Sequence, residues 1–124
     1  MSGRGVGWIL DEGQRATLLE TFPPRYDRVV AHHVTLWGHR KNAHIPQAAE
    51  ILIVGHADNG RDLECYVASV DGETRRPDGS VYHVTWSLDP ETGVAPKDSN
   101  RLLQESEWAP LAEPARLLTR PGFL

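Results

Sequence analysis

The sequence predicts a single α+β domain with antiparallel sheets. The first reason is length, since 124 residues make one ordinary domain and are too few for two independently stable ones. The second is the pattern of apolar residues, which forms several short strand-like segments and only two helix-like ones. The third is turn chemistry, of which Asn59-Gly60 is the clearest case because this pair suits a tight hairpin between two strands.

The N-terminal part of the chain is expected to form a strand, a helix and a second strand. Residues 6–10 are a short apolar run, after which Asp11 can cap a helix and the Gln14 side chain can reach back to complete a capping box. Residues 15–22 have apolar side chains at helical spacing, and the two prolines that follow end the helix. Residues 29–37 are β-branched and apolar, which predicts one continuous strand.

The rest of the chain alternates between strand-like segments and turns. A polar loop is expected over residues 38–47, and strands are expected over residues 49–54, 63–70 and 81–88. Asp98 or Ser99 can cap a short helix over residues 100–105. The proline-rich tail is expected to be an extended segment laid against the body of the domain.

Charge and composition narrow the class of partner. The formal net charge of −4 argues against a broad electrostatic grip on duplex DNA or RNA. A small or terminal phosphate remains compatible, because arginines and lysines cluster before and after residues 33–35 and before residues 83–85. No apolar stretch has membrane-spanning length, and the N-terminus lacks a signal-peptide pattern, so we expect a soluble cytoplasmic protein without a membrane partner. The sequence carries no signal for an oligomeric state.

The sequence His-Val-Thr occurs twice, at residues 33–35 and 83–85, and we call these copies the first and the second motif. They lie 50 positions apart on expected strands, and an apolar residue follows each, which makes a weak internal repeat. Because residues i and i+2 share one face of a strand, the histidine and threonine of each motif should point the same way. The valine between them should point into the core.

Two imidazoles and two hydroxyls suit the cleavage of a phosphodiester. An imidazole titrates near about pH 6.5, so one ring can remove a proton from the attacking group while the other protonates the leaving oxygen. Threonine hydroxyls can donate hydrogen bonds to the non-bridging oxygens, where negative charge sits in the transition state. This chemistry requires no metal, and no cofactor is expected.

With the residues that follow them, the motifs read His33-Val34-Thr35-Leu36 and His83-Val84-Thr85-Trp86, and they resemble the paired HxTx signatures of the 2H phosphoesterase superfamily. This superfamily includes RNA 2′,3′-cyclic phosphodiesterases, the cyclic phosphodiesterase part of fungal and plant tRNA ligases, and LigT-like 2′-5′ enzymes. The resemblance covers residues 6 to about 105. It implies a compact bilobal fold with pseudo-twofold symmetry and a central cleft that holds both motifs.

By the same resemblance, His33 and His83 are expected to be the acid–base pair and Thr35 and Thr85 the contacts to the substrate phosphate. The implied enzyme is a hydrolase of RNA processing or repair that acts on a 2′,3′-cyclic phosphate or a related 2′-5′ or cyclic nucleotide linkage. Its substrate would be a small nucleotide or an RNA terminus. The motifs are closer together here than in most members, so the sequence does not assign the nucleobase, the bond cleaved or the catalytic base.

Several residues near the motifs are possible substrate contacts. Trp37 and Ser87 continue the faces of the two motif strands, and a tryptophan at a cleft edge can stack on a base. The alternative for each aromatic candidate is a place in the core, and for each basic candidate a solvated loop. The candidates are Tyr26, Trp37, Arg40, Lys41, Arg75, Arg76 and Tyr82.

The other histidines and the cysteine carry weaker signals. His32 should point away from His33, toward packing rather than catalysis, because neighbours on a strand face opposite sides. His39, His44 and His56 could bind zinc, but no Asp or Glu joins them at a recognisable ligand spacing. The single cysteine, Cys65, is expected to be a buried strand residue rather than a nucleophile.

Two other functions stay open at the level of sequence. A noncatalytic module could use the same cleft to bind a nucleotide or an RNA end. A structural domain with coincidental motifs would instead place the two histidines far apart.

Overall fold

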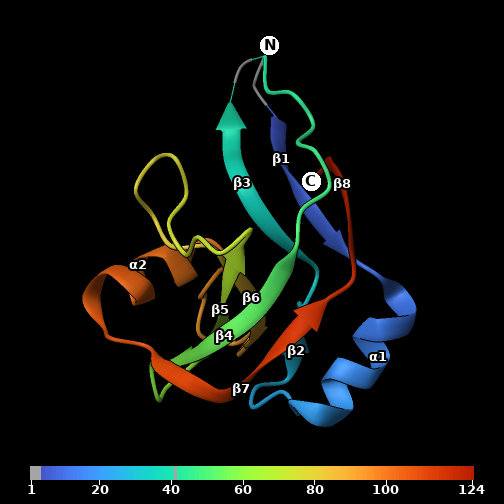
Figure 1. Cartoon of the computed structure of the whole chain (residues 1–124). Helices are drawn as coiled ribbons and strands as arrows, with labels where there is room; N and C mark the ends of the chain where they lie inside the picture. The colour runs from blue at the N-terminus through green and yellow to red at the C-terminus, as the bar shows by residue number, and fades with distance from the viewer. Residues whose placement is uncertain (1–3, 41) are drawn as a thin grey trace.

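The computed structural model describes residues 4–40 and 42–124 (Figure 1). Its helices are α1 (Glu12–Thr21) and α2 (Asp98–Glu105). Its strands are β1 (Arg4–Leu10), β2 (Arg28–Val29), β3 (His33–Arg40), β4 (Ile51–Asp58), β5 (Leu63–Val70), β6 (His83–Leu88), β7 (Ala109–Leu117) and β8 (Thr119–Phe123). Neither helix in this part of the chain has the length and apolar character that crossing a membrane requires.

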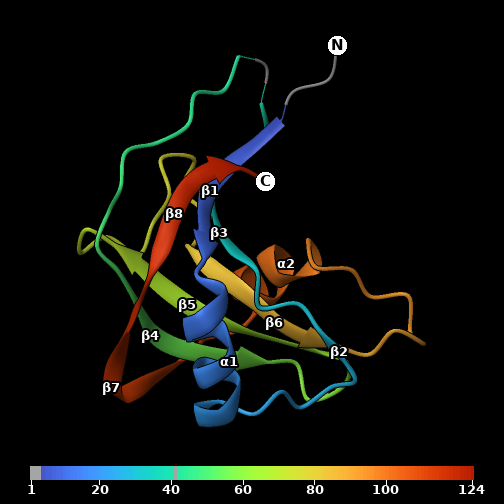
Figure 2. The same ribbon diagram turned by 90° about the vertical axis from the view of Figure 1, so that its right-hand side faces the viewer.

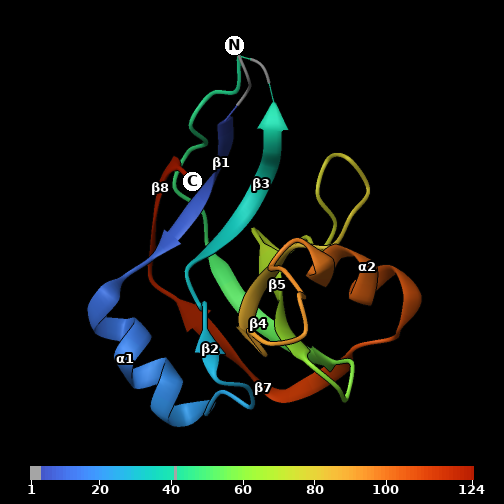
Figure 3. The same ribbon diagram turned by 180° about the vertical axis from the view of Figure 1, so that it is seen from behind.

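The strands form two antiparallel sheets, which confirms a small mixed fold with antiparallel pairing. One sheet has the order β3-β1-β8 and the other the order β2-β6-β5-β4-β7. The three-stranded sheet stands above the larger sheet in Figures 1 and 3. The helices lie on opposite sides of the larger sheet, with α2 on the left and α1 on the right in Figure 1, and Figure 2 shows α1 in front of β4.

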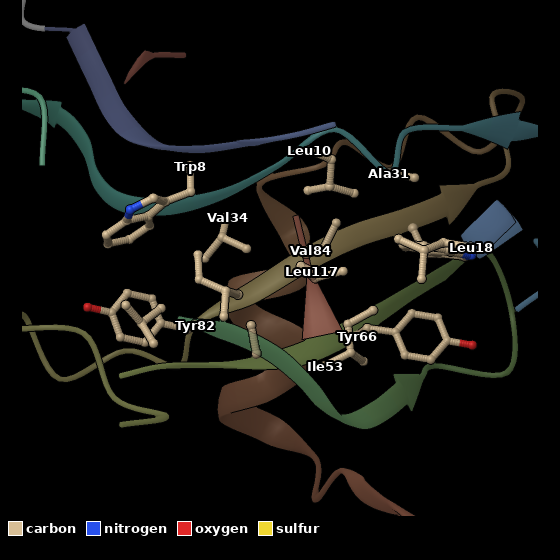
Figure 4. Packing of buried hydrophobic residues seen from close by; sticks show 14 residues of the cluster. Trp8, Leu10, Leu18, Ala31, Val34, Ile53, Tyr66, Tyr82, Val84 and Leu117 are labelled. Carbon is tan, nitrogen blue, oxygen red and sulfur yellow. The ribbon is translucent and has the colours of Figure 1, made fainter. Parts of the chain in front are cut away.

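The main core cluster joins the two sheets (Figure 4). It includes Trp8 and Val34 from the smaller sheet and Ile53 and Val84 from the larger one. The valines of both motifs are fully buried in this cluster, as the alternation of strand residues predicted. Both motif strands are therefore anchored on the same core.

A second cluster lies between the larger sheet and α2. It contains Cys65 from β5, Leu88 from β6 and Leu102 from α2. Cys65 is fully buried, as expected of a strand residue. Burial raises the pKa of its thiol to about 12, against the effect of a hydrogen bond with Ser99, so the group stays protonated at neutral pH.

Helix α1 begins as predicted but uses one of its capping residues differently. The Asp11 carboxylate accepts a hydrogen bond from the Gln14 amide at 2.9 Å. The Gln14 side chain does not reach back to Asp11, so the expected capping box is wrong. It donates to the Arg116 carbonyl at 2.7 Å and accepts from the Leu118 amide at 2.7 Å, which ties α1 to the C-terminal strands.

The expected strand over residues 29–37 is interrupted, and this break positions the site. β2 pairs with β6 in the larger sheet, whereas β3 pairs with β1 in the smaller sheet. Between them Ala31 has a φ of +40°, a conformation that turns the chain from one sheet to the other. The Arg15 guanidinium donates to the Ala31 and Val30 carbonyls at 2.9 and 3.2 Å and so supports the turn.

The proline-rich tail is extended and lies against the body of the domain, as expected, and it forms an edge strand in each sheet. β7 pairs with β4, and β8 pairs with β1. Edge strands tolerate proline because one side of the strand has no ladder hydrogen bonds to lose. The tail therefore connects the two sheets on the side opposite to the motif strands.

Candidate active site

Both motifs line one pocket of about 340 Å³. His33 and Thr35 reach it from β3 in the smaller sheet, and His83 and Thr85 reach it from β6 in the larger one. β3 and β6 contact one another, and the Ala31 amide donates to the Thr85 carbonyl at 2.9 Å beside the turn between the sheets. The motif residues predicted from the sequence are thus brought together. Coincidental motifs were expected to place the two histidines far apart, and the structure does not do so.

The two motif strands share local features. Each motif histidine is the first residue of its strand. The pairing register then slips by one residue just after each threonine: Thr35 and Trp37 lie opposite adjacent residues of β1, and Thr85 and Ser87 opposite adjacent residues of β5. Such a slip interrupts strict alternation. Accordingly neither Trp37 nor Ser87 continues into the pocket lining.

The ring of His83 is held in one tautomer. Its Nδ1 lies 2.9 Å from the Val81 carbonyl, which can only accept, so Nδ1 carries the proton and Nε2 keeps its lone pair while the ring is neutral. Burial lowers the pKa of His83, the bond to Val81 opposes this, and the charge of Arg76 lowers it further. His83 is therefore a neutral imidazole at pH 7, in the form that accepts a proton.

The ring of His33 contacts its neighbour His32. The two Nδ1 atoms are 3.0 Å apart, and the rings meet edge to face with centroids 5.2 Å apart. As expected, His32 does not line the motif pocket and lines a different one, but its ring still contacts that of His33, because His32 precedes β3 and follows the turn at Ala31. Burial, followed by the charges of His32 and His83, lowers the pKa of His33 to about 4.

The two motif threonines differ in their hydrogen bonds. The Thr85 hydroxyl donates to the Pro96 carbonyl at 3.1 Å and lies 2.8 Å from the Ser99 hydroxyl. These bonds hold the start of α2 against β6, and they explain why Ser99 is not the helix cap that the sequence suggested. No hydrogen bond of the Thr35 hydroxyl is found within residues 4–40 and 42–124, so this group can meet a ligand directly.

The start of α2 differs from its expected capping. The helix begins at Asp98, and Lys97 occupies the cap position without a side-chain hydrogen bond. The Asp98 carboxylate instead accepts from the Ala95 amide at 2.8 Å, in the turn that precedes the helix. As a result Lys97 and Asn100 line the pocket. Sequence reasoning missed Lys97 and placed Asn100 only at the start of the expected helix, since nothing local indicates where α2 docks.

Of the possible substrate contacts that lie in the described residues, Arg76 lines the pocket and the others do not. Tyr26 donates to Asp58 at 2.7 Å, and Tyr82 is buried edge to face against Trp8. Trp37 and Arg40 stack on each other, with the guanidinium carbon 3.9 Å from the ring centroid. Arg75 donates to the Gly79 carbonyl at 2.8 Å. Lys41 lies outside the described residues.

The remaining histidines are dispersed. His39 lines the pocket from β3, whereas His44 is exposed in the loop that follows β3. His56 pairs with the buried Glu64 carboxylate at 2.8 Å. Within residues 4–40 and 42–124, no group of three or more His, Cys, Asp or Glu residues is arranged to hold a metal ion.

Comparison with known proteins gave no match: no protein-family model, no curated protein and no solved structure resembles this chain significantly.

Proposed function

We propose that the protein is a metal-independent phosphodiesterase of the 2H type, which opens a 2′,3′-cyclic phosphate or cleaves a related 2′-5′ or cyclic nucleotide linkage. The observation that carries this proposal is the shared pocket, in which an imidazole and a hydroxyl from each motif meet. The pocket size suits a nucleotide or an RNA terminus, because small-ligand sites begin at about 300 Å³.

The hydrogen bonds support different roles for the two histidines. His83, with its proton held on Nδ1 by Val81, presents the Nε2 lone pair and removes a proton from the attacking water. The water oxygen forms a bond to phosphorus as the bond to the sugar oxygen breaks. His33, protonated when the anionic substrate is bound, gives its proton to that sugar oxygen, and the product is a phosphomonoester. The Thr35 hydroxyl donates to a non-bridging oxygen throughout.

The arrangement of the motif strands supports the interpretation of the fold as two related halves around a cleft. Each sheet contributes one motif, each motif starts its strand at the histidine, and each strand slips in register after the threonine. In this interpretation β3 and β6 are the equivalent strands of a bilobal, pseudo-twofold fold.

The experiment that tests the proposal is a substrate panel with variants of the two histidines. The panel contains 2′,3′-cyclic nucleotides, 2′-5′ linked dinucleotides and ADP-ribose cyclic phosphate, and the position of the phosphate in each product is determined. We expect turnover of at least one substrate by the wild-type protein in the presence of EDTA. His33→Ala and His83→Ala should each lower kcat by about 10²–10⁴-fold, the range for loss of a general acid or base.

The controls separate this chemistry from its alternatives. His44→Ala changes an exposed histidine outside the pocket and should leave turnover intact. Thr35→Ala should lower kcat by about 10²–10³-fold, as expected for loss of one transition-state donor. Undiminished cleavage by the His33→Ala/His83→Ala double variant would sink the proposal. Loss of activity on chelation that zinc restores would indicate a metal mechanism, and tight nucleotide binding without any product would indicate a noncatalytic binding module.

A further inference from the structure

Arg76 is a pocket residue with a buried hydrogen-bond donor that lacks a partner. Its side chain is only 9% exposed, and one terminal nitrogen, Nη2, donates to the Asp78 carboxylate at 2.9 Å. The Nε–H group is buried and has no partner among the described residues, and it is the one buried side-chain polar atom there that lacks one. Leaving a buried donor unpaired is unfavourable, and this donor belongs to a residue that lines the pocket.

The turn that carries Arg76 holds the guanidinium in place. The Arg76 amide donates to the Ser80 carbonyl at 2.7 Å, and the Gly79 amide donates back to the Arg76 carbonyl at 2.9 Å. Asp78 accepts from both the amide and the hydroxyl of Ser80, at 2.9 and 2.6 Å, so the carboxylate that pairs with Arg76 is itself fixed. A positioned cation of this kind loses little side-chain entropy when an anion binds.

Two basic side chains line the pocket although the chain is acidic. Arg76 and Lys97 line it, whereas no Asp or Glu side chain of the described residues does. The chain has 17 acidic residues and a formal net charge of −4. Helix amides do not add to these two positive charges, because the amides of residues 98–100 already donate to the carbonyls of residues 95–97. The side chains on this wall therefore select an anionic ligand.

On the side of His83, the guanidinium is better placed than the motif threonine to meet that ligand. The hydroxyl proton of Thr85 is used by Pro96, and Ser99 occupies its other side. Arg76 lies close enough to His83 for its charge to act on the ring. Because Arg76 and His83 line the same pocket, an anion held at the guanidinium would lie in the pocket that His83 also faces.

We propose that Arg76 is the anion-binding residue of this pocket and donates charge-assisted hydrogen bonds to a phosphate oxygen beside His83, while Thr85 mainly positions α2. The guanidinium turns its Nε–H toward the anion, which supplies the missing acceptor. The proposal deepens the proposed function and rests on it for the ligand being a phosphate ester. A guanidinium fits a phosphate because its donors form a planar fork that can bind two oxygens at once.

The test measures binding rather than turnover. Adenosine 2′-monophosphate and inorganic phosphate are titrated by calorimetry into the wild-type protein and into Arg76→Gln, with Arg75→Gln as the matched control. Arg76→Gln should weaken binding of the nucleotide about tenfold to hundredfold, the range for one charged hydrogen bond. Arg75→Gln removes an equal charge from the adjacent exposed position and should change it less than about threefold, since exposed charges are screened.

Three further measurements test whether Arg76 itself binds the anion. Asp78→Asn removes the ion pair but keeps an acceptor for the guanidinium and the guanidinium itself, so it should weaken nucleotide binding far less than Arg76→Gln does, whereas a merely structural role of Arg76 predicts that it fails like Arg76→Gln. In ¹⁵N–¹H spectra, one arginine Nε–H signal should move downfield when the nucleotide binds and should be missing from Arg76→Gln. Thr85→Val should weaken binding less than Arg76→Gln does.

The outcomes distinguish this proposal from the proposed function. A wild-type protein that binds neither probe at millimolar concentration, or a folded Arg76→Gln that binds the nucleotide as tightly as Arg75→Gln, overturns the role of Arg76. Binding that depends on Arg76, without turnover of any cyclic phosphate, supports the anion site and contradicts the phosphodiesterase. Should Arg76→Gln not fold, Arg76→Lys keeps the charge but loses the planar fork, and wild-type affinity in that variant contradicts the proposal.

Discussion

At the scale of single residues, the two motif histidines have different neighbours. His83 is bonded to a backbone carbonyl, whereas His33 faces a second imidazole, that of His32. The pKa of each ring lies below its ordinary value, with burial as the largest cause in both cases. In the free protein at pH 7, both rings are therefore neutral. A mechanism that needs one protonated ring then depends on a form that becomes populated only at lower pH.

The lowered pKa values of the two histidines predict an acidic optimum for kcat/KM, the parameter that reports ionisations of the free enzyme. Because both pKa values lie below about 6.5, kcat/KM should rise as the pH falls from 8 and should reach its maximum below about pH 6.5. The measurement is kcat/KM for a 2′,3′-cyclic nucleotide between pH 4 and pH 9. A maximum on the alkaline side of pH 7.5 would contradict the assignment of these two rings.

A variant of His32 tests the cause of the shift at His33. The charge of His32 is one reason why the pKa of His33 is low, so His32→Gln should raise that pKa and move the profile to higher pH. The movement should be partial, because burial is the larger cause and remains. His44→Gln, at an exposed position outside the pocket, is the matched control and should leave the profile in place.

At the scale of elements, the first motif depends on how closely β1 and β3 approach each other. Gly7 lies opposite Thr35, just where the register of the two strands slips. A Cβ at Gly7 would overlap the Val34 carbonyl oxygen and would come within 3.0 Å of the Thr35 Cα. Only glycine fits here without moving β3, so Gly7 helps to hold the first motif at the pocket.

Gly7→Ala should therefore destabilise the protein by about 1–3 kcal/mol, as overpacking does, and should also reduce turnover because Thr35 moves with β3. The free energy of unfolding in urea measures the first effect. Gly13→Ala is the matched control: this glycine lies in α1, and its added Cβ would meet only Asp11 Oδ2 at an ordinary distance of 3.4 Å. Alanine is the better helix former, so that variant should lose no stability. Equal stability of the two variants would show that the strands can separate without penalty.

At the scale of the whole molecule, several buried groups make stability depend on pH in the same direction. Burial acts to raise the pKa of Glu64, but hydrogen bonds from His56, Ser87 and the Arg25 amide outweigh it and hold the pKa below its ordinary value. The carboxylate thus contributes stability above about pH 4.5, and this contribution is lost as the pH falls. His33 acts in the same sense, because the unfolded chain takes up a proton near about pH 6.5 and the folded chain does not.

The free energy of unfolding should therefore be highest above about pH 6.5 and should fall as the pH is lowered toward 4. Urea denaturation at several pH values measures it. His33→Asn removes one of the titrating rings and should flatten the decline between about pH 6.5 and pH 4.5. His44→Asn should keep the wild-type slope. Identical slopes for the two variants would mean that His33 titrates alike in the folded and unfolded chains.

The residues of the candidate site could be predicted from the sequence because strand alternation is local. An extended backbone turns His33 and Thr35 to one face and Val34 to the other, whatever lies around it, and the same holds for the second motif. Asp11 as the cap of α1 and Cys65 as a buried strand residue follow from equally local rules.

The sequence by itself thus determined the two motif surfaces and most of the strands that carry them. Only the tertiary structure decided that the chain crosses between sheets at Ala31, that Gln14 reaches the C-terminal strands, and that Arg76 rather than its neighbour Arg75 lines the pocket. The physical reason is that each of these outcomes depends on hydrogen bonds or packing between segments far apart in the sequence. Local backbone preferences fix the direction of a side chain, whereas its partner is set by whichever distant element packs against it.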